Sequence, residues 1–295
     1  MPVQIADFPP IPADPGKRDA YKGIDVIWHD PCGVEVLSVD LRKELDETTF
    51  DSVLDVWHRG QVIVFRDQKI EAEDQLRFGR RIGELSGTHT HRFEGENPAI
   101  MYISNEKKDG KFVHALPVGE MMFHIDQCHQ ERPAKATMLF AMKIPLEGGN
   151  TMFCDLYRAY ETLPEDLKKK VAGKKGLNIY DYDAGATQRA AAVSDDAPRC
   201  AHPIVRTHPV TGRKALFVNR LMTRGIEGMA DDEALPILNR LFDPMENPGF
   251  VYEHRWRLGD VLMWDNRCTS HARRDFDPEQ PRLMRRLTIK GEKPV

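Results

Sequence analysis

The sequence lacks any apolar run of about 18 residues, the length that a membrane-spanning helix requires, so we expect no membrane span. Its first residues, MPVQIADFPPIPADPGKRDAYKG, contain acidic residues and prolines but no apolar segment typical of a secretory signal. A basic excess is missing too, because 42 lysines and arginines face 46 aspartates and glutamates, which gives a formal charge of −4. A general nucleic-acid binder, which must neutralise phosphates, is therefore excluded.

The five cysteines are scattered along the chain and form no Cys-x-x-Cys pair. An odd, scattered set is typical of a reduced cytoplasmic protein and does not suggest a disulfide framework. Glycine-rich phosphate-binding motifs are missing as well, since neither G-x-G-x-x-G nor G-x-x-x-x-G-K-[ST] follows a predicted strand. The two commonest phosphate cradles are thus not expected.

Short apolar segments predict strands at 33–40, 61–68, 100–104, 134–145, 213–219, 250–258, 260–266 and 283–291. Helical periodicity predicts helices at 48–60, 72–85, 157–176 and 231–245. This mainly β pattern with interspersed helices favours an antiparallel sandwich or barrel over a repeating βαβ sheet. We expect one domain over residues 1–295, with 1–22 as an extended arm and 181–201 as a mobile loop or lid.

The stretch FHIDQ at 123–127 places a histidine and an aspartate two residues apart in an apolar segment. On a strand, His124 and Asp126 would point to the same side and offer two adjacent metal ligands. Two histidines and one carboxylate with open positions are typical of non-haem Fe(II) oxygenases. A bare H-x-D is weak, because a hydrogen-bonded pair gives the same pattern. The rival pairs are His129 with Glu131, which runs into an Arg-Pro, and His89 with His91.

A third ligand must come from a distant part of the chain, and His271, just after the strand-like DVLMWDN and the connection RCTS, is the candidate. Arg286 lies fifteen residues further on, in a segment that could run back beside it. A planar guanidinium can bind a carboxylate cosubstrate through two parallel hydrogen bonds. Trp264 and Asn266 precede His271, and a core tryptophan with a turn asparagine explains them as well as a role at the metal does.

Several longer motifs then resemble the taurine/2,4-dichlorophenoxyacetate dioxygenase family (TauD/TfdA), whose members depend on Fe(II) and 2-oxoglutarate. They begin with GVEVLSVDL, QVIVFRDQ and FGRRIGEL, and continue with FHID and GGNTMF. HPIVRTHPVTGRKALFVN, GDVLMWDNRCTSH and RLMRRLTIKGEKP follow, so the resemblance covers most of the chain.

The resemblance implies a double-stranded β-helix (jelly-roll) core with flanking helices. By motif position, His124, Asp126 and His271 match the iron ligands of the family. Thr151 and Arg286 match the residues that hold the far carboxylate of 2-oxoglutarate, and Arg282 lies in the same basic strand. Fe(II), 2-oxoglutarate and O2 would then support hydroxylation of a C–H bond, with release of succinate and CO2. Relatives are often dimers or tetramers, so a homo-oligomer is expected by analogy.

The substrate is less well defined by the sequence. The family places a substrate-binding histidine near FGRRIGELSGTHTHRF, where His89 and His91 are equal candidates. Two departures argue against taurine, since Glu120 replaces an expected asparagine and Met222 an expected phenylalanine. Two arginines near the latter, Arg220 and Arg224, are candidate anion contacts or ordinary surface residues.

We therefore expect a small organic anion as substrate, of the aryloxyalkanoate or alkanesulfonate type, whose hydroxylated product would break down spontaneously. Hydroxylation of an amino acid or another carboxylate is the alternative. Two other classes remain open: a cupin-like metalloenzyme that uses His89 and His91 without a 2-oxo acid, and a jelly-roll that serves only as a binding module.

Overall fold

The computed structural model describes residues 11, 15–87, 91, 93, 95–116, 118–181 and 193–295. Most of the predicted arm and residues 182–192 of the predicted lid lie outside these ranges, as does His89. The last residues of both segments do form strands, because Lys17–Tyr21 is β1 and β12 begins at Arg199.

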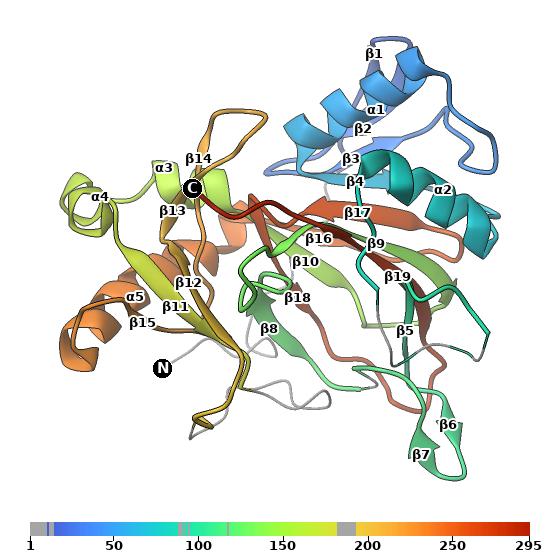
Figure 1. Ribbon diagram of the computed structural model, residues 1–295. Coiled ribbons are helices and arrows are strands. Elements are labelled where there is room, and N and C mark those ends of the chain that lie inside the picture. The colour runs from blue at the N-terminus through green and yellow to red at the C-terminus, as the bar shows by residue number, and fades with distance from the viewer. Residues whose placement is uncertain are drawn as a thin grey trace.

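Two antiparallel-rich sheets face each other and form the body of the molecule (Figure 1). The larger sheet has the order β1-β2-β3-β4-β17-β9-β19-β5, and the smaller has the order β16-β10-β18-β8. The strands of the larger sheet are β1 (Lys17–Tyr21), β2 (Ile24–Trp28), β3 (Val34–Val36), β4 (Val62–Phe65), β5 (Ile100–Ser104), β9 (Ala134–Lys143), β17 (Val261–Asp265) and β19 (Leu283–Lys290). Those of the smaller sheet are β8 (Met121–His124), β10 (Thr151–Asp155), β16 (Val251–His254) and β18 (Thr269–Arg273). This is the mainly β jelly-roll core that the sequence predicts.

Strand β4 shows why the larger sheet is buried on both faces. Its residues alternate, so that Val62 and Val64 pack towards the smaller sheet, in a cluster with Phe153. Ile63 and Phe65 pack in the opposite direction, in a separate cluster. The continuous apolar run VIVF is thus the signature of a strand covered on both sides.

Helices cover the outer faces of both sheets (Figure 1). On the larger sheet lie α1 (Glu47–Gly60), whose N-cap Asp46 accepts a hydrogen bond from the Thr49 amide, and α2 (Ala72–Ile82). Beside the smaller sheet lie α3 (Leu156–Glu161), α4 (Glu165–Val171) and α5 (Asp231–Met245). None of the helices in the described ranges combines the length and the apolar character needed to cross a membrane.

The remaining strands form three small sheets: β12-β11-β15, β13-β14 and β6-β7. Their bounds are β6 (Lys107–Lys108), β7 (Lys111–Phe112), β11 (Lys175–Ile179), β12 (Arg199–Pro203), β13 (Val205–Thr207), β14 (Lys214–Leu216) and β15 (Thr223–Ile226), and the short 3-10 helix η2 spans Pro248–Phe250.

Several predicted elements are wrong in extent; the strand expected at 33–40, for example, is confined to Val34–Val36. The helix expected at 157–176 is broken into α3 and α4 because Pro164 ends the first and caps the second, and its last residues belong to β11. The strand expected at 250–258 is confined to Val251–His254, preceded by η2 and followed by an irregular segment. The helix was predicted as continuous because charged residues at helical spacing run across the break. The strand was predicted too long because its aromatic residues favour β structure.

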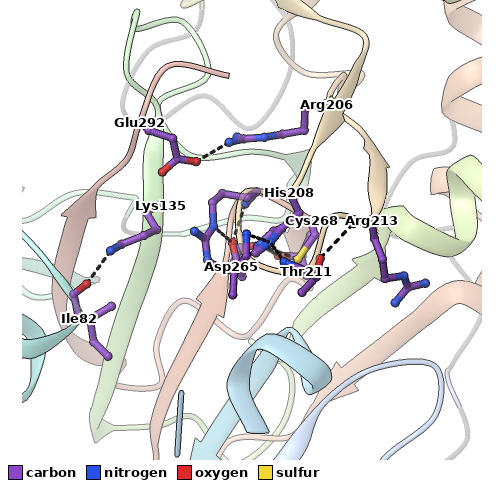
Figure 2. Close-up of polar contacts among 12 residues, drawn as sticks. Ile82, Lys135, Arg206, His208, Thr211, Arg213, Asp265, Cys268 and Glu292 are labelled. Carbon is purple, nitrogen blue, oxygen red and sulfur yellow. Dashed lines mark hydrogen bonds and ion pairs between the residues drawn. The ribbon is translucent and has the colours of Figure 1, made fainter. Parts of the chain in front are cut away.

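A buried ion-pair cluster fixes the end of β17 to the β13–β14 hairpin (Figure 2). Asp265, fully buried, accepts hydrogen bonds from Arg267 Nε at 2.8 Å and from His208 Nε2 at 3.0 Å. Burial alone would raise the pKa of Asp265, but Arg267 and His208 outweigh it and hold that pKa well below its usual range. The carboxylate is therefore ionised, and its partners are positioned by the strand ends.

Replacing Asp265 tests this cluster. Asp265→Asn should lower the free energy of unfolding at pH 7 by about 3–5 kcal/mol, because it leaves the buried Arg267 guanidinium without its counter-charge. Since the folded-state pKa is depressed, the stabilisation is complete above the unfolded value of about 4 and declines as the pH falls below it. Urea unfolding of both proteins should therefore show a smaller difference at pH 3 than at pH 7.

Asp40→Asn is the matched control, because Asp40 pairs with Arg42 on the surface and such pairs contribute about 1 kcal/mol or less. Equal stability of Asp265→Asn and the wild type at pH 7 would contradict the structural role of the cluster.

Candidate active site

The predicted histidines lie opposite each other on neighbouring strands of the smaller sheet. His124 is the last residue of β8, and the register pairs it with His271 in the middle of β18. Asp126 lies in the turn that follows β8, so the prediction that His124 and Asp126 share one strand is wrong. The turn nevertheless brings the carboxylate to the same place.

The three side chains form a compact, buried group. The two imidazole rings are 4.0 Å apart between centroids. Asp126 Oδ1 lies 3.9 Å from His124 Nε2, and the other carboxylate oxygen, Oδ2, lies 4.0 Å from His271 Nε2. Two ligand atoms that each lie about 2.1 Å from a metal ion are at most about 4.2 Å apart, so these separations suit a single ion. Two imidazoles and one carboxylate are the donor set that Fe(II) accepts while keeping positions open.

The protonation states of the group also suit a metal. Burial lowers the pKa of His124 and lowers that of His271 further, so both rings are neutral at neutral pH. Burial alone would raise the pKa of Asp126, but Arg286 and the two histidines outweigh it and keep the carboxylate ionised. Metal ligation needs this combination of neutral imidazoles and a charged carboxylate.

Main-chain contacts orient the first histidine. His124 Nδ1 lies 2.9 Å from the Met122 carbonyl oxygen, to which its N–H donates, so Nε2 carries the free lone pair. The Nδ1 atom of His271 is buried and has no hydrogen-bond partner among the described residues.

A hydrogen-bonded network orients Asp126. Thr137 Oγ1 donates to Asp126 Oδ2 at 2.6 Å, and Asn266 Nδ2 in turn donates to Thr137 Oγ1 at 3.1 Å. The Asn266 carbonyl oxygen accepts from the Asp126 amide and from the Trp264 indole N–H. Asn266 and Trp264 thus belong to the hydrogen-bonded network that orients the Asp126 carboxylate. Thr137, on β9, was not among the predicted site residues, because only its position opposite Asp126 in the fold shows its role.

Arg286 reaches the same carboxylate from the larger sheet. Its Nη2 lies 2.9 Å from Asp126 Oδ1. Strand β19 pairs with β9 and β5, so the expectation that Arg286 runs back beside the His271 strand is wrong. The guanidinium instead crosses the space between the two sheets.

A second group of possible ligands, His208, Asp265 and Cys268, differs in its hydrogen bonding (Figure 2). Asp265 is already paired with the Arg267 guanidinium. Nδ1 of His208 accepts from two main-chain amides while its Nε2 faces Asp265. The hydrogen-bonding atoms of Asp265 and His208 are thus already paired within the protein, so this group of three residues fits a structural role.

A cavity of about 360 Å³ opens beside His124 and Asp126. Its walls combine methionines with neutral polar groups, and Arg286 is the one cationic side chain among its described lining residues. The lining residues are Ser86, Gly87, His91, Ala99, Met101, Ala115, Leu116, Met121, His124, Asp126, Gln127, His129, Gln130, Tyr180, Met222, Arg286 and Thr288. The ionised Asp126 also lines this cavity and pairs with Arg286, so the cavity would suit an anion with an apolar body once a metal ion compensates Asp126.

A smaller cavity adjoins the first and shares His124 and Arg286 with it. Thr151 and Arg282 line it, together with apolar side chains from both sheets. Arg282 is almost fully buried, and within the described part of the chain it makes no ion pair and its Nε has no hydrogen-bond partner. Burial, and then the nearby Arg273, lower its pKa well below the usual value, which shows how poorly its charge is compensated.

Arg273 is not available for the same purpose. Its guanidinium donates to the main-chain oxygens of Leu116, Val118 and Gly119. Of these two buried arginines, Arg282 is therefore the one whose charge an anionic ligand would compensate.

The predicted substrate residues separate into two groups. His91 and Met222 line the larger cavity. Glu120 is half-buried and lines neither described cavity.

The two arginines expected near Met222 are also outside both cavities. Arg220 pairs with Glu246 at 2.6 Å, and Arg224 forms an ion pair with Asp181. Their positive charges are therefore already compensated within the protein.

An aromatic wall of the larger cavity escaped the sequence prediction. The rings of His129 and Tyr180 lie 4.8 Å apart, and burial lowers the pKa of His129 to about 4, so its ring is neutral. The rival motif partner of His129, Glu131, is exposed and pairs with Lys293 at 3.0 Å. His129 thus contributes to the cavity without forming an H-x-E metal pair.

Comparisons with known proteins agree with this geometry. A family model described as "Taurine catabolism dioxygenase TauD, TfdA family" matches residues 28–288. An alpha-ketoglutarate-dependent 2,4-dichlorophenoxyacetate dioxygenase of Burkholderia sp. (strain RASC) is 35% identical over 247 residues, covering 79% of this chain and 82% of its own. An alpha-ketoglutarate-dependent sulfate ester dioxygenase of Pseudomonas putida is 30% identical, covering 89% and 88%.

Solved structures give the same result. A taurine dioxygenase from Burkholderia xenovorans superposes with a TM-score of 0.78 at 27% identity, covering 92% of this chain and 91% of its own. The protein AAD-2, in complex with Mn(II) and N-oxalylglycine, gives a TM-score of 0.76 at 30% identity, covering 92% and 98%. The family, the fold class and the enzyme class predicted from the sequence are confirmed: the chain belongs to the TauD/TfdA family of dioxygenases.

Proposed function

We propose that the protein hydroxylates a C–H bond of a small aromatic organic anion, with 2-oxoglutarate as cosubstrate. The observation that carries the proposal is the buried His124, Asp126 and His271 group, which lies beside a cavity containing the uncompensated Arg282 guanidinium. Bound Fe(II) would supply O2 activation, coupled to conversion of 2-oxoglutarate to succinate and CO2. The protein's own residues bind, orient and shield the reactants.

The three protein side chains would hold the iron. Thr137 occupies Asp126 Oδ2 and leaves Oδ1 for the metal, while the contact between His124 and Met122 directs Nε2 inwards. A divalent ion would also take over the charge compensation of Asp126, which Arg286 provides in this structure. The guanidinium would then be free to bind a substrate anion.

Arg282 and Thr151, rather than Arg286, are assigned to the far carboxylate of 2-oxoglutarate. Two methylene groups separate that carboxylate from the oxo group, which must lie at the metal. Arg286, at 2.9 Å from Asp126, belongs to the metal end. Arg282 and Thr151 line the smaller cavity, and a charge-assisted contact there would compensate the buried guanidinium.

The larger cavity supports an aryloxyalkanoate as the substrate. Arg286 can bind the carboxylate, and the paired rings of His129 and Tyr180 offer a flat surface to an aromatic ring. Met222 and the other methionines adapt to substituents on that ring. The Burkholderia relative named for 2,4-dichlorophenoxyacetate supports this class, whereas the Pseudomonas putida relative named for sulfate esters supports a sulfate ester as the second candidate.

A homo-oligomeric state and a cytoplasmic location are part of the same proposal, by analogy with the family and from the reduced, scattered cysteines. The described cysteines are all free. Size-exclusion chromatography with light scattering tests the first, and fractionation of the source cells tests the second.

Succinate release tests the reaction. The wild-type protein with Fe(II) should release succinate from 2-oxoglutarate, several-fold faster with an aryloxyalkanoate than without, and Asp126→Ala should abolish this turnover while remaining folded. Circular dichroism provides the folding control. Full activity of Asp126→Ala would remove this residue from the metal site, and no succinate from the wild type with any anion would refute the reaction class.

Two arginine variants separate the cosubstrate site from the substrate site. Arg282→Ala should raise the KM for 2-oxoglutarate about 30-fold or more, because a lost charge-assisted contact costs about 2 kcal/mol. Arg286→Ala should raise the KM for the organic anion by a similar factor and leave that for 2-oxoglutarate within about threefold. Exposed Arg80→Ala is the matched control. Exchanged effects of the two variants would restore Arg286 as the cosubstrate anchor.

Thr137 tests how Asp126 is held. Thr137→Val keeps the shape but removes the hydroxyl, and should weaken Mn(II) binding about 10- to 100-fold, as outer contacts of metal ligands typically do. Thr137→Ser retains the hydroxyl and serves as the control. Calorimetric titration of the metal gives the dissociation constants, and identical values for Thr137→Val and the wild type would show that the hydroxyl is irrelevant.

A further inference from the structure

Trp256 contacts the smaller cavity only indirectly, through a residue of its wall. It lies two residues beyond β16, which pairs with β10 in the smaller sheet (Figure 1). Its indole Nε1 lies 3.0 Å from Oγ1 of Thr151, the first residue of β10. Thr151 lines the smaller cavity, whereas Trp256 lines a different cavity.

The chemistry of the two groups fixes the direction of this hydrogen bond. An indole N–H can only donate, so Thr151 Oγ1 must be the acceptor. The hydroxyl proton of Thr151 therefore cannot point towards Trp256. The described residues offer this proton no other acceptor, so it is left for a group inside the cavity.

The ring of Trp256 is itself held in place. It packs edge to face on His254, with ring centroids 4.6 Å apart. His254 Nε2 lies 3.1 Å from Asp260 Oδ2, and Arg66 pairs with the same aspartate at 2.6 Å. This buried chain restricts the indole to the orientation that reaches Thr151.

We propose that Trp256 is a positioning residue for the cosubstrate: its N–H donates to Thr151 Oγ1 and thereby directs the Thr151 hydroxyl proton at the far carboxylate of 2-oxoglutarate. A carboxylate can only accept, so a hydroxyl that is already turned towards it binds without a reorientation cost. Donation to the oxygen also polarises the O–H bond and strengthens its own donation. Trp256 therefore selects a carboxylate at this position without touching it.

The inference rests on the proposed function. Binding measurements on four proteins distinguish a failure of the inference from a failure of the proposed function. Calorimetry on the Mn(II)-loaded wild type, Trp256→Phe, Thr151→Val and the double variant gives the dissociation constants for 2-oxoglutarate. Trp256→Phe should weaken binding about 5- to 10-fold, the scale of one polar contact, with Mn(II) affinity unchanged. In the Thr151→Val background the same change should have no further effect, because the hydroxyl through which Trp256 acts is gone.

Each other outcome has a definite meaning. Unchanged 2-oxoglutarate affinity in Trp256→Phe, or independent effects that multiply in the double variant, would overturn the positioning role. Loss of Mn(II) binding in Trp256→Phe would do the same, because the effect would then be general. A wild-type protein that binds Mn(II) but not 2-oxoglutarate would refute the proposed function itself.

A second replacement at position 256 keeps the test valid if the phenylalanine variant does not fold. Benzothienylalanine at position 256 keeps the size and shape of the indole but has sulfur in place of N–H. It should reproduce the weaker 2-oxoglutarate binding at wild-type thermal stability. Wild-type affinity with this side chain would overturn the proposal.

Discussion

The architecture of the site depends on the compensation of one buried carboxylate. Asp126 is buried between the two sheets, where an isolated charge would be very costly. The groups around it come from separate elements: Thr137 on β9 donates a hydrogen bond and Arg286 on β19 supplies the positive charge, while the two neutral imidazoles of β8 and β18 lie beside the carboxylate. The jelly-roll brings these four strands to one place, so the compensation of the Asp126 charge depends on the closure of the two sheets.

The sequence alone predicted the parts of the site that are adjacent in the chain or belong to recognisable motifs. His124, Asp126 and His271 were predicted together, and the structure brings one possible ligand atom of each within 4.8 Å of the others. The shared strand predicted for the first two is wrong, because β8 ends at His124 and a turn carries Asp126. Apolar alternation predicts a strand but does not mark where a short one stops.

The parts that could not be predicted depend on contacts across the sheets. A threonine in the middle of a strand, such as Thr137, is ordinary in sequence and acquires its role only opposite Asp126. Trp256 lies 105 positions from Thr151 along the chain. The division of tasks that we propose for Arg282 and Arg286 is equally invisible in the sequence, because the two arginines are close together in the chain and only the cavities distinguish them.

Arg286 lines both cavities, and this has a thermodynamic consequence. A side chain that borders both reactants can link their two binding equilibria, even though the far carboxylate of 2-oxoglutarate is assigned to Arg282. Whatever factor the organic anion imposes on the affinity for the 2-oxo acid, the 2-oxo acid must impose on the affinity for the organic anion. Arg286, which borders both reactants, is a side chain through which such coupling would act.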